Sequence, residues 1–490
     1  MEAAAEKNIE HGVRRYLFPF LFLVMLGFLQ ACRPPFGDSG LGKRGCRKCH
    51  EVRLDAKHMF KCTRCHGGRP EGWFKEEAHE GLAAHPASPG NSKKYCAGCH
   101  RNQEDSSRAS IHYTLEKEIG TLWQAFFPED APPSVADVSG AVRPRDKKAL
   151  IRDVLARRCL RCHVYYRGDS YPGTGHGKGC AACHMDTGRK GHRFFKRPKE
   201  ENCLSCHHSN FVGWDYVGRF EKDYPEDFRA PLSKGRHISR PYAVEWISMQ
   251  PDIHKKAGLT CLDCHKGRPF HPGSAKKAER GMEGCIRCHS PDEKIIGHGR
   301  KDRQRVRCGT CHAVWGVLDL GRNLMRQDAP DLEEWIFLRV QGSSEIEQIL
   351  DGWADSAETP PAGVLTMADK ISGTMLPGLW FAAFDQRRWE VVLGADKNGR
   401  LSVIRPLLDI SVSYVDEEGD TVFDSLVPAP EGSGRSSAIT RIVYPPSLQV
   451  VPVPKPSLWL PYHPHTIGKA DYFRTRFVQG FLKAGVISSR

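Results

Sequence analysis

Apolar residues are scarce in this chain for its length. Only 40% of the 490 residues are hydrophobic and 9% are aromatic, and the mean hydropathy is −0.49. A chain of this length has room for two or three domains, but this composition leaves little apolar area with which to build them. The apolar run from Tyr16 to Leu29 is too short to span a bilayer comfortably. The composition therefore argues against several large cores made of side chains alone.

The first residues have the pattern of an export signal. Arg14 and Arg15 precede the apolar run, which ends in Leu29-Gln30-Ala31-Cys32. This ending resembles the lipobox of bacterial lipoproteins, and the resemblance implies that residues 1–31 are removed and that Cys32 is lipidated. The alternative is a plain secretory signal followed by a stray cysteine. Because Arg33 rather than Asp follows, the familiar inner-membrane retention signal is absent, and an outer-membrane lipid anchor is expected.

Nineteen cysteines are too many for an ordinary reduced cytoplasmic enzyme. Eighteen of them form nine pairs, and every pair has the sequence Cys-x-x-Cys-His. The paired cysteines are Cys46/Cys49, Cys62/Cys65, Cys96/Cys99, Cys159/Cys162, Cys180/Cys183, Cys203/Cys206, Cys261/Cys264, Cys285/Cys288 and Cys308/Cys311. The histidines that follow them are His50, His66, His100, His163, His184, His207, His265, His289 and His312.

This spacing is the attachment motif for c-type haem. The two thiols would form thioethers with the haem vinyl groups, and the adjacent histidine would supply the proximal iron ligand. Zinc ribbons also use Cys-x-x-Cys, but they have no reason to place histidine after each pair, and disulfides need no histidine. Histidine accounts for only 23 of the 490 residues, so its presence in all nine motifs is not accidental. The sequence predicts nine covalently bound haem c groups, attached outside the cytoplasm.

Nine haems would need nine further ligands, and thirteen histidines remain outside the motifs and the signal. Bis-histidine ligation is therefore expected at most irons, with at least four histidines left for other roles. Position relative to the motifs selects ten candidates, several of which recur four, ten or eleven residues before a motif. They are His58, His85, His176, His192, His254, His298, His112, His208, His237 and His271. His79 ranks lower, because it lies close to His85 and has no counterpart in the repeats.

Two more histidines lie near the C-terminus, in Tyr462-His463-Pro464-His465-Thr466. This segment resembles the Pro-His-Thr sequence that precedes a final haem motif in some large multihaem cytochromes, but the expected cysteines are missing. Three interpretations stay open. The segment is a degenerate haem module, or one of its histidines folds back as a distal ligand, or it is a surface loop.

The motifs fall into three groups of three, separated by intervals of 63 and 58 residues between first cysteines. The last two groups match in spacing, which predicts a duplicated trihaem unit. The expected organisation is the signal, three trihaem modules with two linkers between them, and a haem-free C-terminal segment. Their boundaries are 1–31, 32–110, 111–158 (helical linker), 159–207, 208–260 (linker), 261–312 and 313–490.

The stretch His176-Gly-Lys-Gly-Cys180-Ala-Ala-Cys183-His184 resembles the trihaem cytochromes of the c7 group, relatives of cytochrome c3. The likeness covers about residues 46–312. It implies a multihaem cytochrome c fold with little regular secondary structure and short helices around stacked haems. The sequence departs from that family in the spacing of the second and third motifs, and in lacking a histidine four residues before Cys285.

The haem-free segment 313–490 has different sequence signals. Alternating apolar stretches flank Asp396-Lys397-Asn398-Gly399 and Glu417-Glu418-Gly419, which predicts two hairpins. Short helices are expected within residues 331–350. A small α+β or β-rich domain is therefore expected at the C-terminal end.

The formal charge of +14 alone would suggest nucleic acid or an acidic membrane surface. Each haem would add two propionates, which offset this charge, so no nucleic-acid partner is expected. The favoured function is electron transfer without enzymatic activity. Expected partners are other c-type cytochromes, quinol- or porin-linked redox proteins, and extracellular metal oxides, met at the periplasmic face of the outer membrane or the cell surface.

Two alternative functions stay open. A multihaem reductase of nitrite, hydroxylamine or a sulfur oxyanion would need an iron with an open position, and the haem of His289 is the first suspect. A polymerised cytochrome filament or an electron store is the other alternative. Carbon monoxide binding to the reduced protein separates the reductase from the electron carrier.

Overall fold

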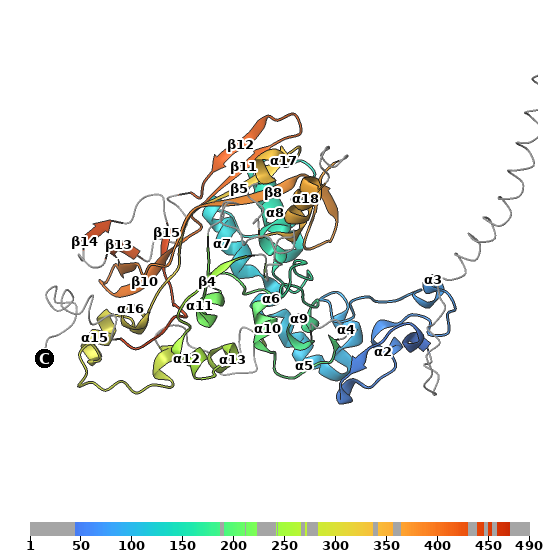
Figure 1. Cartoon of the computed structure of the whole chain (residues 1–490), viewed down its shortest axis with the longest axis horizontal. Coiled ribbons are helices and arrows are strands. Elements are labelled where there is room, and N and C mark those ends of the chain that lie inside the picture. Colours follow the sequence, from blue (N-terminus) through green and yellow to red (C-terminus); the bar gives the residue numbers. More distant parts are fainter. Residues whose placement is uncertain are drawn as a thin grey trace, which may run out of the picture. The chain divides into compact units, whose positions relative to one another are not determined.

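A computed structural model describes residues 45–186, 191–210, 212–222, 242, 244–265, 270–271, 283–336, 342–355, 364–429, 439–444, 449–452 and 458–470 (Figure 1). The predicted signal, Cys32 and His237 lie outside these residues. The chain divides into two compact units, Met1–Ala83 with Arg189–His192, and Ala84–Gly188 with Arg193–Arg490. Among the described residues, no helix is both long and apolar enough to cross a membrane.

The first unit contains the first two cysteine motifs and only short elements. Strands β1 and β2 pair in parallel, with Leu54 opposite His192. The elements are η1 (Gly45–Lys48), β1 (Arg53–Leu54), η2 (Ala56–His58), α2 (Thr63–His66), α3 (Lys75–Ala78) and β2 (Gly191–His192).

The helices of the second unit are mostly single turns at or near the cysteine motifs, with three longer exceptions in α5, α7 and α8. Up to the ninth motif they are α4 (Ser92–Tyr95), α5 (Ala97–Arg108), α6 (Ile111–Thr114), α7 (Glu116–Phe126), η3 (Val135–Asp137), α8 (Lys147–Arg157), η4 (Cys159–Arg161), α9 (Cys180–His184), α10 (Glu200–Leu204), α11 (Trp214–Val217), α12 (Ile253–Lys256), α13 (Cys261–Cys264), α14 (Glu283–Ile286), α15 (Arg300–Arg305) and α16 (Cys308–His312). The short strands β3 (Arg219–Glu221) and β4 (Trp246–Ser248) pair antiparallel.

The C-terminal segment is rich in strands, as its sequence predicts. One sheet has the order β12-β11-β5-β8 and another has the order β14-β13-β9-β10-β15. The elements are β5 (Leu318–Gln327), α17 (Leu332–Ile336), α18 (Ser344–Asp355), β6 (Thr366–Ala368), β7 (Met375–Pro377), β8 (Leu379–Arg388), β9 (Leu393–Asp396), β10 (Leu401–Leu407), β11 (Ile410–Val415), β12 (Thr421–Leu426), β13 (Ile439–Tyr444), β14 (Gln449–Pro452) and β15 (Leu458–Pro461).

Both expected hairpins are present, β9–β10 and β11–β12. Each turn begins with an aspartate whose carboxylate accepts backbone N–H groups. Asp396 accepts from Asn398 and Arg400, both at 2.9 Å, and Asp416 accepts from Glu418 and Asp420. Gly399 and Gly419 have φ angles of 75° and 85°, which glycine adopts without the Cβ penalty of other residues.

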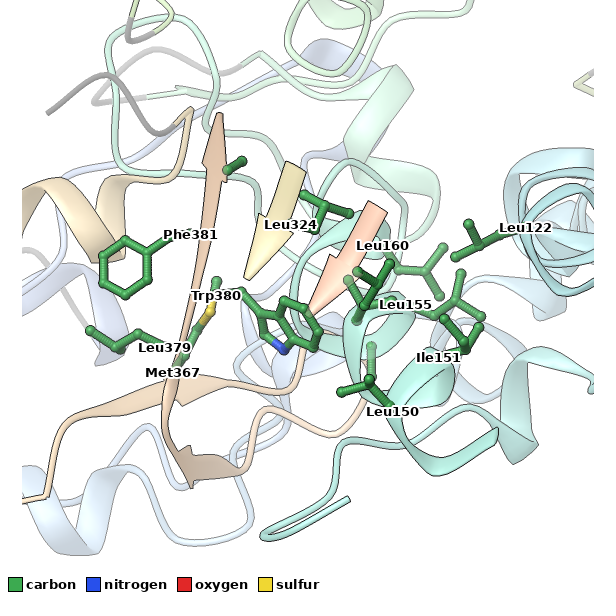
Figure 2. Packing of buried hydrophobic residues seen from close by; sticks show 14 of the residues in the cluster. Leu122, Leu150, Ile151, Leu155, Leu160, Leu324, Met367, Leu379, Trp380 and Phe381 are labelled. Atoms are coloured by element: carbon green, nitrogen blue, oxygen red, sulfur yellow. The ribbon is translucent and has the colours of Figure 1, made fainter. Parts of the chain in front are cut away.

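The segment expected as a helical linker begins with α6 and α7, which are separated at Leu115, whose φ is 52°. Helices α7 and α8 do not stand apart from the C-terminal segment. Their apolar faces share one buried core with β5, β8, β11, α17 and α18. Figure 2 shows Trp380 of β8 pointing toward Leu150 and Leu155 of α8. The segment expected as a linker therefore packs with strands from the haem-free segment.

A buried polar network lies within this core. The Asp153 carboxylate of α8 accepts hydrogen bonds from Trp380 Nε1 at 2.8 Å and from Arg326 Nη1 at 3.0 Å. Its other oxygen accepts from the Ala141 backbone at 2.8 Å. Asp153, Arg326 and Trp380 are fully buried, so each polar group depends on the others for its hydrogen bonds.

Candidate haem sites

Most of the nine motifs form one helical turn. In six of them the backbone N–H of the histidine donates to the carbonyl of the first cysteine, at 2.8–3.0 Å. In two more, the motif itself is a helix, α9 or α16. Positions i, i+3 and i+4 of a helix share one face. The two thiols and the imidazole of each of these motifs therefore project to the same side, as attachment to one porphyrin requires.

The fourth motif differs from the others. It forms the 3₁₀ turn η4, which is broken at Leu160, and it directly follows α8. Its His163 Nδ1 accepts a hydrogen bond from the Tyr165 backbone at 2.9 Å. The Nε2 atoms of His163 and of His176, a predicted ligand, are both buried without a hydrogen-bond partner. Burial, and next the nearby His176, lower the pKa of His163 to about 3.

Seven motif histidines face a histidine from outside the motifs. Two imidazoles that bind one iron from opposite sides have ring centres about 6 Å apart, because each metal–nitrogen bond is about 2 Å long. The centre-to-centre distances are 5.9 Å for His50 and His79, 5.7 Å for His66 and His192, 6.4 Å for His207 and His112, 6.2 Å for His184 and His271, 6.1 Å for His265 and His465, 5.9 Å for His289 and His254, and 6.1 Å for His312 and His298. These gaps fit one iron each.

Five of the ten histidines selected from sequence take part in these pairs, namely His112, His192, His254, His271 and His298. His58 Nδ1 contacts Asp55 at 2.9 Å, and His208 stacks on Tyr242 with its Nδ1 facing the Ser205 carbonyl. His85 is exposed, and its carbonyl accepts from Asn91. As ligands, His58, His85, His176, His208 and His237 stay predictions.

Two histidines outside the selected set, His79 and His465, also face a motif histidine. His79 is the C-cap of α3, and nothing in its sequence context marks it more strongly than its neighbour His85. For His465, the Pro-His-Thr segment was a usable signal. Of the three interpretations of that segment, the structure favours a histidine that folds back.

Residues 462–468, here called the C-terminal strap, run between the last three motifs. The Val314 N–H donates to the Thr466 carbonyl and the Gly468 N–H to the His312 carbonyl, both at 2.9 Å. The Gly468 carbonyl accepts from His312 Nδ1 at 3.0 Å. The strap thus supplies the partner of His265 and orients His312.

None of the eighteen described cysteines forms a disulfide, and thiols of neighbouring motifs lie close together. The largest cause that raises the pKa of Cys203 is a hydrogen bond with Cys261. The sixth motif therefore lies beside the seventh. A hydrogen bond from Cys285 lowers the pKa of Cys308 to about 6. The eighth motif therefore lies beside the ninth motif. The first contact lies across the boundary between the second and third groups, and the second lies within the third group.

The burial of the cysteines differs between motifs. The second cysteine is exposed in four motifs, at Cys49, Cys99, Cys264 and Cys288, whereas the other fourteen motif cysteines are half-buried.

The exposure of Cys49 and Cys99 has a local cause. Cys49 follows η1, which buries none of its own residues. Cys99 lies in the first turn of α5, a helix whose buried residues, Glu104 and Ser107, come from its later turns. Little apolar side-chain surface is thus available to cover either thiol. A thioether needs a thiol beside a vinyl group rather than a buried one, so haem attachment at Cys49 and Cys99 stays a prediction.

Exposed apolar side chains around the first motifs also fit a large apolar cofactor. Met59, Phe60, Trp73 and Phe74 are between 50% and 85% exposed. A cluster of large apolar side chains in water is unfavourable unless something covers it. The flat faces of porphyrins attached at Cys46 and Cys62 would provide such a cover.

Comparisons of the chain with protein-family models, with curated proteins and with solved structures find no match. The assignment of the sites therefore depends on the motifs and on the geometry described above.

Proposed function

We propose that this chain is an exported c-type cytochrome with nine haems that carries electrons. The observation that supports this most strongly is the set of seven imidazole pairs, each of which combines a motif histidine with a histidine from elsewhere in the chain. When bound, haem c supplies a one-electron ferric/ferrous couple whose potential the surrounding protein adjusts.

The residues of the chain hold and order the sites. The paired histidines would occupy both axial positions, which leaves no place for a reactant at those irons. The thiol contacts Cys203–Cys261 and Cys285–Cys308 place successive sites side by side. Electron transfer between neighbours needs only proximity and suitable potentials. The proposed partners are therefore redox proteins or an extracellular metal oxide at the membrane surface, rather than a bound small molecule.

The fourth motif is the feature that favours a second function, reduction of a small oxyanion. Its broken turn and the role of His163 Nδ1 as acceptor set it apart, so a reductase of a small oxyanion would most naturally use this site. His289, the first suspect from sequence, faces His254 at 5.9 Å.

The test is the number of electrons that the purified oxidised protein accepts, combined with its reoxidation by small substrates. The expected result is nine electrons per chain, with reoxidation rates unchanged by nitrite or hydroxylamine. Carbon monoxide that binds one haem per chain, together with reoxidation by one of these substrates, would favour the reductase. A capacity of far fewer electrons would contradict both functions.

A further inference from the structure

The imidazoles of the candidate sites differ in what their second nitrogen contacts. An axial histidine binds iron through one ring nitrogen, and the other is oriented by a hydrogen-bond acceptor. In His66, His184 and His312 the Nδ1 atom faces a backbone carbonyl, at 2.9–3.0 Å. In His254 it faces a carboxylate instead, Asp252 at 2.7 Å, within hydrogen-bond distance. In His465 it lies 3.4 Å from the Asp215 carboxylate without forming a hydrogen bond to it.

Both carboxylates are held firmly and are shielded from water. Their side chains are 4% exposed for Asp252 and 0% for Asp215. Asp252 also accepts from the His254 and Ile467 backbones, each at 2.8 Å. Asp215 accepts from the Tyr462 hydroxyl and from the His465 backbone. Salt screens such buried charges much less than it screens charges at the surface.

The two sites are also neighbours. The seventh site pairs His265 with His465, and the eighth pairs His289 with His254. The thiols of Cys264 and Cys288, one from each motif, lie close enough for Cys288 to contribute to the raised pKa of Cys264, after burial and the Asp252 charge as the larger causes. The C-terminal strap contacts both carboxylates, so it fixes both distal histidines together.

We propose that Asp215 and Asp252 lower the reduction potentials of the seventh and eighth haems below those of sites whose imidazoles face only backbone carbonyls. This inference rests on the proposed function, because it needs iron between the paired histidines. A carboxylate that accepts the Nδ1 proton, as Asp252 can from His254, makes the imidazole a more basic ligand, and a more basic axial ligand stabilises ferric over ferrous iron. Asp215 acts through its buried negative charge 3.4 Å from the His465 ring, which also favours the ferric state. The two sites then form an adjacent pair that is reduced last.

A third carboxylate contact, between His58 and Asp55, follows the same rule in a weaker form. The Asp55 side chain is 19% exposed, so water screens its charge more than it screens those of Asp215 and Asp252. Whichever site His58 serves is expected to show a smaller effect.

The test compares Asp252→Asn and Asp215→Asn with the unaltered chain, in a redox titration of the full protein followed by visible and EPR spectra. Asparagine keeps a carbonyl oxygen for Nδ1–H but removes the charge. In each variant one of nine components should move upward by a tenfold change in its ferric/ferrous ratio, or about 59 mV for one electron. All haems should stay low-spin.

Because Asp263 lies inside the seventh motif and caps α13, the matched control is Glu293→Gln rather than a variant of Asp263. It removes an equal charge four residues after His289, where the 58% exposed Glu293 contacts Arg303 rather than a motif histidine. No component of this variant should shift by more than about twofold, because the charge is solvent-screened. Unmoved components in both test variants, a shift equal to the control's, or a loss of low-spin signal would each overturn the inference.

The unaltered chain gives an independent check if the variants do not accumulate. Two of its nine components should be reduced last, as a pair separated from the rest, and a single narrow group of potentials would overturn the inference. Haem content, read from the intact mass, reports separately on the proposed function. A protein with nine haems and unmoved potentials refutes only the inference drawn from the carboxylates.

Discussion

At the scale of the residue, the feature that recurs in this molecule is a pair of facing histidines. Each pair joins a histidine whose place is fixed by Cys-x-x-Cys-His to one that no local pattern fixes. His66 and His192 meet because β1 and β2 pair side by side. His265 and His465 meet because the strap is bonded to the chain around α12 and α16. The proposed set of iron ligands therefore depends on the tertiary structure as well as on the Cys-x-x-Cys-His motifs.

Replacing His465 tests the least expected of these pairs. In His465→Ala, the iron at His265 should lose its distal ligand, so one haem of nine should turn high-spin and the reduced protein should bind one carbon monoxide per chain. The measurement is carbon monoxide titration followed in the Soret band.

His463→Ala is the control, since His463 lies on the same strap and its ring faces His465 rather than a motif histidine. It should bind no additional carbon monoxide. The assignment of His465 fails if both variants behave alike, or if neither differs from the unaltered protein.

At the scale of the element, α8 connects the two kinds of structure in this chain. Its apolar face is part of the core shared with the C-terminal sheet, and its C-terminal end leads directly into the fourth motif. Asp146 caps its first turn by accepting from the Ala149 backbone at 2.8 Å. Packing of α8 against β8 thus positions the fourth site.

Removing the Asp153 carboxylate should destabilise this core. Asp153→Ala leaves Trp380 Nε1 buried without its acceptor and removes one of the two carboxylates that pair with Arg326, the other being Asp328. Breaking a buried ion pair from one side costs about 3–5 kcal/mol. Urea unfolding followed by far-UV circular dichroism should show an earlier loss of strand signal. Asp105→Ala, at an exposed position of α5, should change stability by less than about 0.5 kcal/mol. Equal midpoints for the two variants would contradict this role of Asp153.

The strap can be tested as an element through its backbone. Ile467→Pro removes the N–H that donates to Asp252 at 2.8 Å, while Ile467→Ala keeps it. The proline variant should gain carbon monoxide binding at the seventh site, because His465 is no longer held opposite His265. The alanine variant should not. Identical binding by the two variants would show that the strap is not held through this hydrogen bond.

At the scale of the whole molecule, the sequence predicts local structure better than the arrangement of the parts. Nine motifs, two hairpins and the helices of 331–350 follow from local spacing and turn residues such as Gly399 and Gly419. The partner of His50 does not, because the sequence favours His85 over His79, and only the position of α3 places His79 opposite His50. The packing of α7 and α8 on distant strands likewise has no local signal.

The proposed membrane anchor concerns the whole chain, and a single substitution tests it. Cys32→Ser should release the exported protein from the membrane fraction, because lipidation needs the thiol. Its haem content should be unchanged, since Cys32 belongs to none of the nine motifs. The measurement is fractionation of cells followed by haem staining. Retention of the serine variant in the membrane would contradict lipid anchoring at this residue.

The most direct measurement of the central claim is the intact mass of the exported, mature chain, taken together with its EPR spectrum. The account predicts a chain that carries nine covalent haems, with low-spin ferric signals from at least the seven sites whose histidines face each other. A mature chain without the added mass of nine haems, or one whose irons are mainly high-spin, would contradict it.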